Sequence, residues 1–95
     1  MKRVSFKAKV VIWTGNLGWH FVYLPKDLAE KIKKSKKSYG GGFIKVEAKV
    51  GKTTWQTSLF PYTREKTYLV CIKKSVREKE DIFSGETVEV LLKFI

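Results

Sequence analysis

The sequence is poor in the residues that disulfides, metal sites and membrane anchors need. It contains one cysteine, Cys71, and one histidine, His20. An internal disulfide is therefore excluded, and a structural zinc site, which takes about four nitrogen or sulfur ligands, cannot be assembled. No apolar run approaches the roughly 20 residues of a membrane helix, and Lys7 and Lys9 interrupt any apolar signal segment. These features predict a cytoplasmic protein without metal, cofactor or membrane partner.

Acidic residues are also scarce. Lysine and arginine number 20 against 9 aspartates and glutamates, which gives a formal net charge of +11. Such an imbalance favours an anionic partner such as nucleic acid or acidic lipid, although excess lysine also serves solubility alone. Asparagine and glutamine occur once each, and a lysine-rich, amide-poor composition is a feature of thermophilic proteins.

Alternating apolar and polar residues predict a mainly β domain that covers residues 1–95. A short helix is expected from Lys26 to about Lys34, after Pro25, and a helical turn within 74–82. The lysine run that follows the first helix predicts a basic loop over 35–42. The six expected strands are 4–12, 18–24, 44–50, 53–60, 66–73 and 87–94.

The two halves of the chain are similar to each other. Residues 21–31 align without gaps on residues 69–79, with four identities in eleven positions. Each half also has the expected order strand, strand, short helix, strand. This pattern predicts a small closed six-stranded barrel built from half-repeats of about 1–50 and 51–95, related by a pseudo-twofold axis.

One stretch, Gly18–Pro25, resembles the GWHFV-x-LP strand of a small prokaryotic family of unknown function. Departures are Val70-Cys71, where members usually carry Pro-Val, and Gly85-Glu86, where Gly-Asp is usual. The resemblance implies a small β-barrel similar to the double-split barrels of AbrB-like regulators, which are DNA-binding dimers of half-length subunits. A single chain with two half-barrels looks like a fused form of that dimer. Further matching pieces are 42–46, 58–61, 68–73, 75–78 and 85–88.

The first functional hypothesis is a non-enzymatic nucleic-acid-binding or regulatory module, monomeric or weakly dimeric. Lysines on the helix and the basic loop would contact phosphates, and Tyr39 would stack on a base. A solvated loop without a partner is the alternative. Because no base-reading helix rich in Arg, Asn or Gln is visible, DNA or RNA binding should depend weakly on sequence. The candidate residues are Lys33, Lys34, Lys36, Lys37 and Tyr39, with Lys7 and Lys9, and Lys45 and Lys49 if their strands lie close.

The second hypothesis is a barrel that binds a small molecule or sugar in an aromatic pocket at one mouth. The same aromatic residues would otherwise fill the core. The candidate residues are Trp13, Trp19, His20, Tyr23 and Trp55.

An enzyme is the least favoured class, because no nucleophile, base and orienting group occur together. His20 is interpreted as a structural histidine held by one ring nitrogen to the backbone, and Cys71 as an inert core thiol; a Cys71–His20 pair is the minor alternative. The carboxylates Glu78, Glu80 and Asp81 indicate a solvated turn rather than a metal site. Glycines 40–42 lead into a strand, whereas phosphate loops lead into a helix.

Overall fold

The computed structural model describes residues 3–13, 18–35 and 42–95. In this part of the chain, seven strands form one sheet that is accompanied by two α-helices and one turn of 3₁₀-helix. The mainly β prediction is thus confirmed. The elements are β1 (Arg3–Lys9), β2 (Val11–Ile12), β3 (His20–Tyr23), α1 (Lys26–Ser35), β4 (Ile44–Val50), β5 (Thr53–Tyr62), η1 (Thr63–Glu65), β6 (Thr67–Cys71), α2 (Lys74–Glu80) and β7 (Thr87–Phe94).

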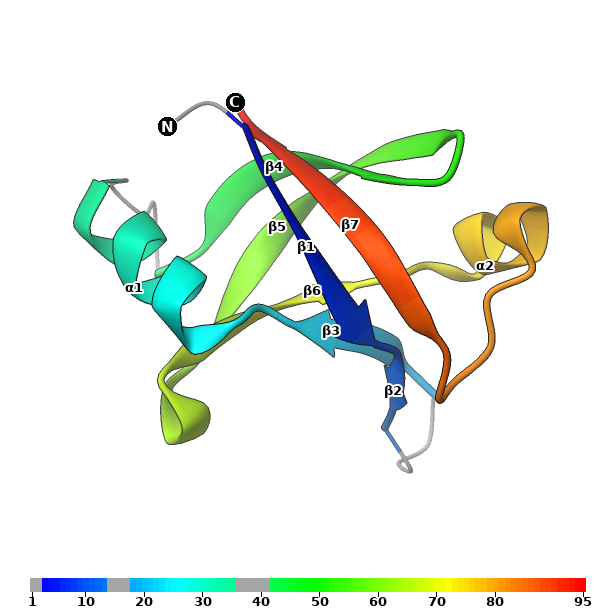
Figure 1. Ribbon diagram of the computed structural model, residues 1–95, viewed down its shortest axis with the longest axis horizontal. Coiled ribbons are helices and arrows are strands. Elements are labelled where there is room, and N and C mark those ends of the chain that lie inside the picture. Colours follow the sequence, from blue (N-terminus) through cyan, green and yellow to red (C-terminus); the bar gives the residue numbers. More distant parts are fainter. Residues whose placement is uncertain (1–2, 14–17, 36–41) are drawn as a thin grey trace.

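The sheet is open and strongly curled, so the expected closed six-stranded barrel is wrong in this respect (Figure 1). The strand order is β1-β7-β4-β5-β6-β3-β2, with antiparallel neighbours throughout. The difference arises at Val10, where the predicted first strand divides into β1 and β2. The Val10 amide donates a 2.8 Å hydrogen bond to the Glu86 carbonyl, and the Val10 carbonyl accepts one of 2.8 Å from the Gly85 amide. The chain thereby passes directly from one edge strand of the sheet to the other.

The two helices lie at opposite ends of the curled sheet (Figure 1). Helix α1 follows Pro25, which suits the start of a helix because no amide hydrogen is needed there. It buries Ala29 and Ile32, and it ends at Ser35, which the sequence had assigned to the loop. Residues 36–41 of that predicted loop lie outside the described residues, whereas Gly42 is described shortly before β4. Helix α2 replaces the expected helical turn and buries Val76.

Neither described helix is long and apolar enough to span a membrane.

The hydrophobic core occupies the inner face of the curled sheet. Successive residues of a strand point to opposite faces, so the alternating pattern of the sequence places every second side chain inside. Strand β4, for example, buries Ile44, Val46, Ala48 and Val50. The polar residues between them face outward, and the lysines predicted to face water do so. Fully buried branched residues from all parts of the sheet meet in this core: Val22, Val46, Leu59, Val70, Val90 and Leu92.

The two similar segments of the sequence pair with each other as β3 and β6. Val22 and Val70, which occupy equivalent positions in the sequence alignment, are direct partners across the two strands. Two hydrogen bonds flank them symmetrically: the Leu24 amide donates to the Tyr68 carbonyl at 3.0 Å, and the Ile72 amide donates to the His20 carbonyl at 2.9 Å. In the sequence alignment Leu24 is equivalent to Ile72, and His20 precedes the aligned segment by the same distance as Tyr68, so exchanging the two segments turns one hydrogen bond into the other. The two strand–helix units are therefore related by a local twofold exchange about Val22 and Val70.

Candidate nucleic-acid interface

Six cationic side chains share the outer face of three neighbouring strands, and we call this surface the basic face. Strand β7 pairs with β1 on one side and with β4 on the other, so the lysines predicted on β1 and β4 lie only one strand apart. All six residues are exposed, because the alternate residues of each strand point into the core. The members of the basic face are Arg3, Lys7, Lys9, Lys45, Lys49 and Lys93.

The cross-strand register of the basic face leaves several cations beside neutral partners. Lys9 lies opposite Thr87, and Lys49 lies between Thr54 on β5 and Leu91 on β7. Arg3 lies directly opposite Lys93, an arrangement that costs stability because like charges repel at this distance. An anion bound across β1 and β7 would relieve that repulsion.

Two carboxylates on the same face moderate its charge. Glu89 lies opposite Lys7, and Glu47 lies opposite Lys93. The basic face still carries six cations against these two anions, so its net charge is positive. Both ends of β1 are cationic on this face, with Arg3 at one end and Lys9 at the other.

The helical part of the predicted lysine cluster lies on a different element. Lys33 and Lys34 are exposed on the last turn of α1, which packs against β6. Lys34 forms an exposed ion pair of 3.4 Å with Glu30, one helical turn earlier. The remaining predicted members, Lys36, Lys37 and Tyr39, lie outside the described residues.

The aromatic residues predicted to line a ligand pocket point to different sides of the sheet. Trp55 is 7% exposed in the core, opposite Ala48. Trp13 and Trp19 lie at the β2 edge of the sheet, where their side chains are 56% and 49% exposed. The Trp13 amide donates a 2.7 Å hydrogen bond to the Trp19 carbonyl. Tyr23 points to the outer face of β3. The structure does not bring these side chains to one cavity.

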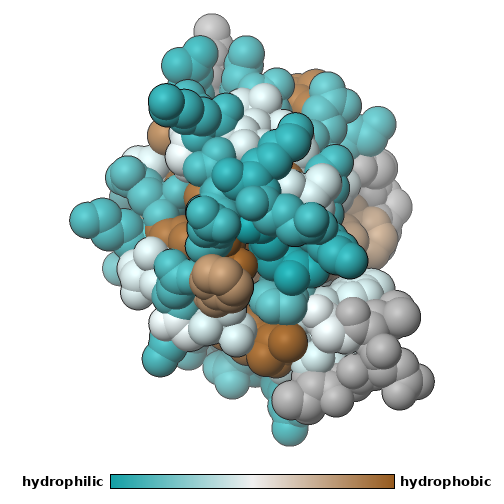
Figure 2. All heavy atoms as spheres, turned by 90° about the vertical axis from the view of Figure 1, so that its right-hand side faces the viewer, coloured by the Kyte–Doolittle hydropathy of each residue, from teal (hydrophilic) through white to brown (hydrophobic). Residues whose placement is uncertain are grey.

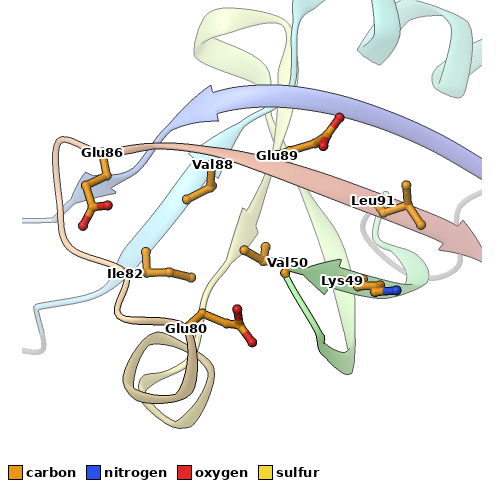
Figure 3. Close-up of a pocket in the computed structure, with 9 residues that line it drawn as sticks. Lys49, Val50, Glu80, Ile82, Glu86, Val88, Glu89 and Leu91 are labelled. Atoms are coloured by element: carbon orange, nitrogen blue, oxygen red, sulfur yellow. The ribbon is translucent and has the colours of Figure 1, made fainter.

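A shallow hollow of about 460 Å³ opens instead between β7, the β4–β5 turn and the end of α2 (Figure 3). Two of its three acidic side chains have structural partners: Glu80 accepts a 2.6 Å hydrogen bond from the Thr53 hydroxyl, and Glu86 accepts one of 2.9 Å from the Phe83 amide, while Glu89 is the third. Gly51, with φ of 60°, gives Glu80 the room to reach the turn. Figure 2 shows that hydrophilic side chains cover most of this end of the molecule. The hollow is thus a by-product of how α2 is fastened to the β4–β5 turn.

His20 and Cys71 do not form a pair. Phe21 is the cross-strand partner of Cys71, so the two share the outer face, while the neighbouring His20 points to the other face of β3. The Nδ1 atom of His20 lies 2.8 Å from the Gly18 carbonyl oxygen. Because a carbonyl only accepts, Nδ1 carries the hydrogen, and the ring has the single backbone contact that the sequence interpretation expected.

The thiol of Cys71 should react slowly at neutral pH. The side chain is half-buried on the outer face, so the expectation of a core cysteine is wrong, but burial still raises the pKa of the Cys71 thiol above its ordinary value. Because the thiolate is the nucleophile, we expect its reaction with an aromatic disulfide reagent at pH 7.5 to be at least about tenfold slower than that of a free cysteine peptide. The rate should rise only at alkaline pH, and the difference should vanish in denaturant. Equal rates for folded protein and peptide at pH 7.5 would contradict the buried, neutral thiol.

Sequence reasoning missed an aromatic cluster on the outer face, which we call the outer aromatic cluster. The rings of Phe21 and Tyr23 pack edge to face with their centroids 5.2 Å apart. The ring of Tyr23 also packs against that of Tyr62, with centroids 5.4 Å apart. A second contact joins Phe43 and Phe60 at 5.1 Å. Burial first, and then Tyr62 and Glu65, raise the pKa of Tyr23 above its ordinary value. One sequence signal could have revealed it: Phe60 and Tyr62 lie two residues apart, as on one face of a strand. Strand β5 indeed continues through Pro61 to Tyr62, beyond the expected end at residue 60.

Together the curled sheet and its outer face define a small basic β-sheet domain. Residues 6–92 match the family described as a domain of unknown function (DUF1905), so the chain belongs to that family. The resemblance to an uncharacterised small family is thereby confirmed. A search of curated proteins finds no match to this chain.

Proposed function

We propose that this domain binds nucleic acid through the basic face, with little dependence on base sequence. The observation that supports the proposal is the convergence of Lys7, Lys9, Lys45 and Lys49, from strands far apart in the sequence, with Arg3 and Lys93 on one exposed surface. Phosphate groups bound there would offset the repulsion between Arg3 and Lys93, which Glu47, on the other side of Lys93, offsets only in part.

The weak sequence dependence follows from the kind of side chain on this face. Five of the six cations are lysines, which act as flexible point charges and suit phosphates rather than base edges. The face is also built on strands of a curled sheet, and the described helices present lysine-rich or mixed-charge surfaces instead of the Arg, Asn and Gln pairs that read the major groove.

The test is the affinity of the protein for labelled DNA, duplex and single-stranded, at about 50 and 200 mM salt. Release of counterions from four to six neutralised phosphates should weaken binding roughly 150- to 1,800-fold for the duplex and roughly 50- to 340-fold for the single strand between these conditions. Two oligonucleotides of equal length and unrelated sequence should bind within about threefold of each other, since phosphate contacts carry no sequence information. Absence of binding to either form at 50 mM salt would refute the proposal.

A further inference from the structure

The outer aromatic cluster forms an apolar layer separate from the core. Phe21 and Leu69 are buried, yet they do not belong to the core cluster, because their side chains point to the outer face of the sheet. Leu69 lies between Tyr23 on β3 and Phe60 on β5 in the strand register. Surface side chains of a small domain are ordinarily polar on such a face, so a continuous aromatic layer outside the core needs an explanation.

This aromatic layer adjoins the basic face within a single strand. Phe43 immediately precedes β4 and Lys45 is the second residue of that strand, so the two lie on the same outer side, about 6.4–6.8 Å apart along the chain. Across on β5, Phe60 follows Ser58, the partner of Lys45, with the same spacing. The lysines and the rings therefore lie on the same side of the curled sheet and meet at Lys45 and Phe43, with the lysines over β1, β7 and β4 and the rings over β5 and β3.

We infer that the outer aromatic cluster is a stacking platform and that the nucleic acid bound by this domain is single-stranded. Aromatic rings on the open face of a sheet stack on bases only where those bases are not already stacked and paired within a duplex. The lysines beside the cluster hold the backbone, and every base offers a flat face to a ring, so the combination suits many sequences. The inference rests on the proposed function and specifies the form of its ligand.

Within the outer aromatic cluster, Phe43 and Tyr62 are the rings to replace; Trp13 and Trp19, which are 56% and 49% exposed, lie outside the cluster and are kept in the variant. Phe43 is 40% exposed, and Tyr62 is partly exposed at the end of β5, whereas Phe21 is buried beneath Tyr23. Replacing these two rings removes stacking surface while it leaves the buried layer of Phe21 and Leu69 in place. A Phe43→Ala/Tyr62→Leu double variant is therefore expected to fold, which circular dichroism and thermal unfolding verify directly.

The experiment compares the affinities of a labelled 15-nucleotide single strand and a duplex of equal length at 50 mM salt. Wild type should prefer the single strand. The double variant should bind the single strand at least about tenfold more weakly, with an unchanged slope of affinity against salt, because stacking is lost and phosphate contacts are kept. Phe83→Ala is the matched control: this ring is 66% exposed between α2 and β7 and should leave binding unchanged. The variant Phe43→Trp, which keeps a flat ring at this position, should bind the single strand as tightly as wild type.

The outcomes separate the two proposals. No binding of either DNA form by wild type would overturn the proposed function and the inference together. Equal affinity for duplex and single strand, with both unchanged in the double variant, would overturn the inference and leave the basic face as a phosphate-binding surface. A wild-type dimer in sedimentation that becomes monomeric in the double variant would show that a second copy covers the cluster, and this too would overturn the inference.

Discussion

Reversing three charges on the basic face should abolish most nucleic-acid binding. The variant Arg3→Glu/Lys9→Glu/Lys49→Glu removes three phosphate contacts and places three carboxylates against the phosphate backbone. We expect binding at 50 mM salt to weaken on the order of 100-fold, and the slope of affinity against salt to fall by about two to three. Labelled DNA and fluorescence anisotropy measure both quantities.

These three positions are chosen to leave the fold intact. The strand partners of Lys9 and Lys49 are neutral, so a glutamate at either position meets no carboxylate directly across. Arg3→Glu replaces the opposition of Arg3 and Lys93 with an attractive cross-strand pair. Lys49 also lines the hollow beside Glu80, Glu86 and Glu89, so Lys49→Glu should lower the melting temperature slightly, and circular dichroism at the binding temperature verifies that the variant is folded.

The matched control reverses three exposed lysines elsewhere: Lys31→Glu/Lys33→Glu/Lys73→Glu, on α1 and before α2. Both triple variants carry the same net charge, so a general effect of charge would weaken them equally. Binding in the control should stay within about threefold of wild type at matched ionic strength. Equal losses in the two variants would mean that overall charge, and not this surface, attracts the ligand.

Leu59→Ala should cause a large loss of stability. Leu59 is fully buried, and it lies where β5 changes partners: it pairs with Ile44 on β4, while the next residue, Phe60, pairs with Leu69 on β6. Removal of this side chain leaves a cavity at the junction of the two parts of the sheet. We expect a loss of about 3 kcal/mol in the free energy of unfolding, within the range of roughly 2–5 kcal/mol for such replacements.

Chemical denaturation and the melting temperature measure this effect. A loss of about 3 kcal/mol should lower the melting temperature by at least about 10 °C in a domain of this size. Leu91→Ala is the control of identical chemistry, because Leu91 is 38% exposed on the outer face of β7 and should cost less than about 1 kcal/mol. If both variants lose the same small amount, the core does not run continuously past Leu59.

The sequence allowed the prediction of most strands, because alternation reports directly which side chains a strand buries. β4 and β7 were expected within a residue of their ends, and Pro25 located the start of α1. The division of β1 and β2 was missed, because every second residue from Val4 to Ile12 is apolar, and the apolar Val11 at an outward position was not given weight. That break depends on the hydrogen bonds of Val10 with Gly85 and Glu86, which lie far away in the sequence.

The functional surface was predictable only in part. Lysines alternating with core residues on residues 4–12 and 44–50 indicated two basic strands, and their proximity was correctly made conditional on the fold. The aromatic cluster was not foreseen, since Phe21 and Tyr23 belong to a strand with two apolar faces. Alternation cannot say which of two apolar faces meets the core; the register of β3 with β6 decides it.

The pairing of Arg3 with Lys93 also has a kinetic consequence. During synthesis β1 emerges well before β7, so it has no ladder partner until nearly all of the described chain has been made. Pairings between residues so far apart in sequence close long loops and slow folding to the range of milliseconds to seconds. Strand β7 also lies between the cations of β1 and those of β4. The ligand surface and the last-completed part of the sheet are thus assembled in the same step, and a nascent chain without β7 has no basic face to offer.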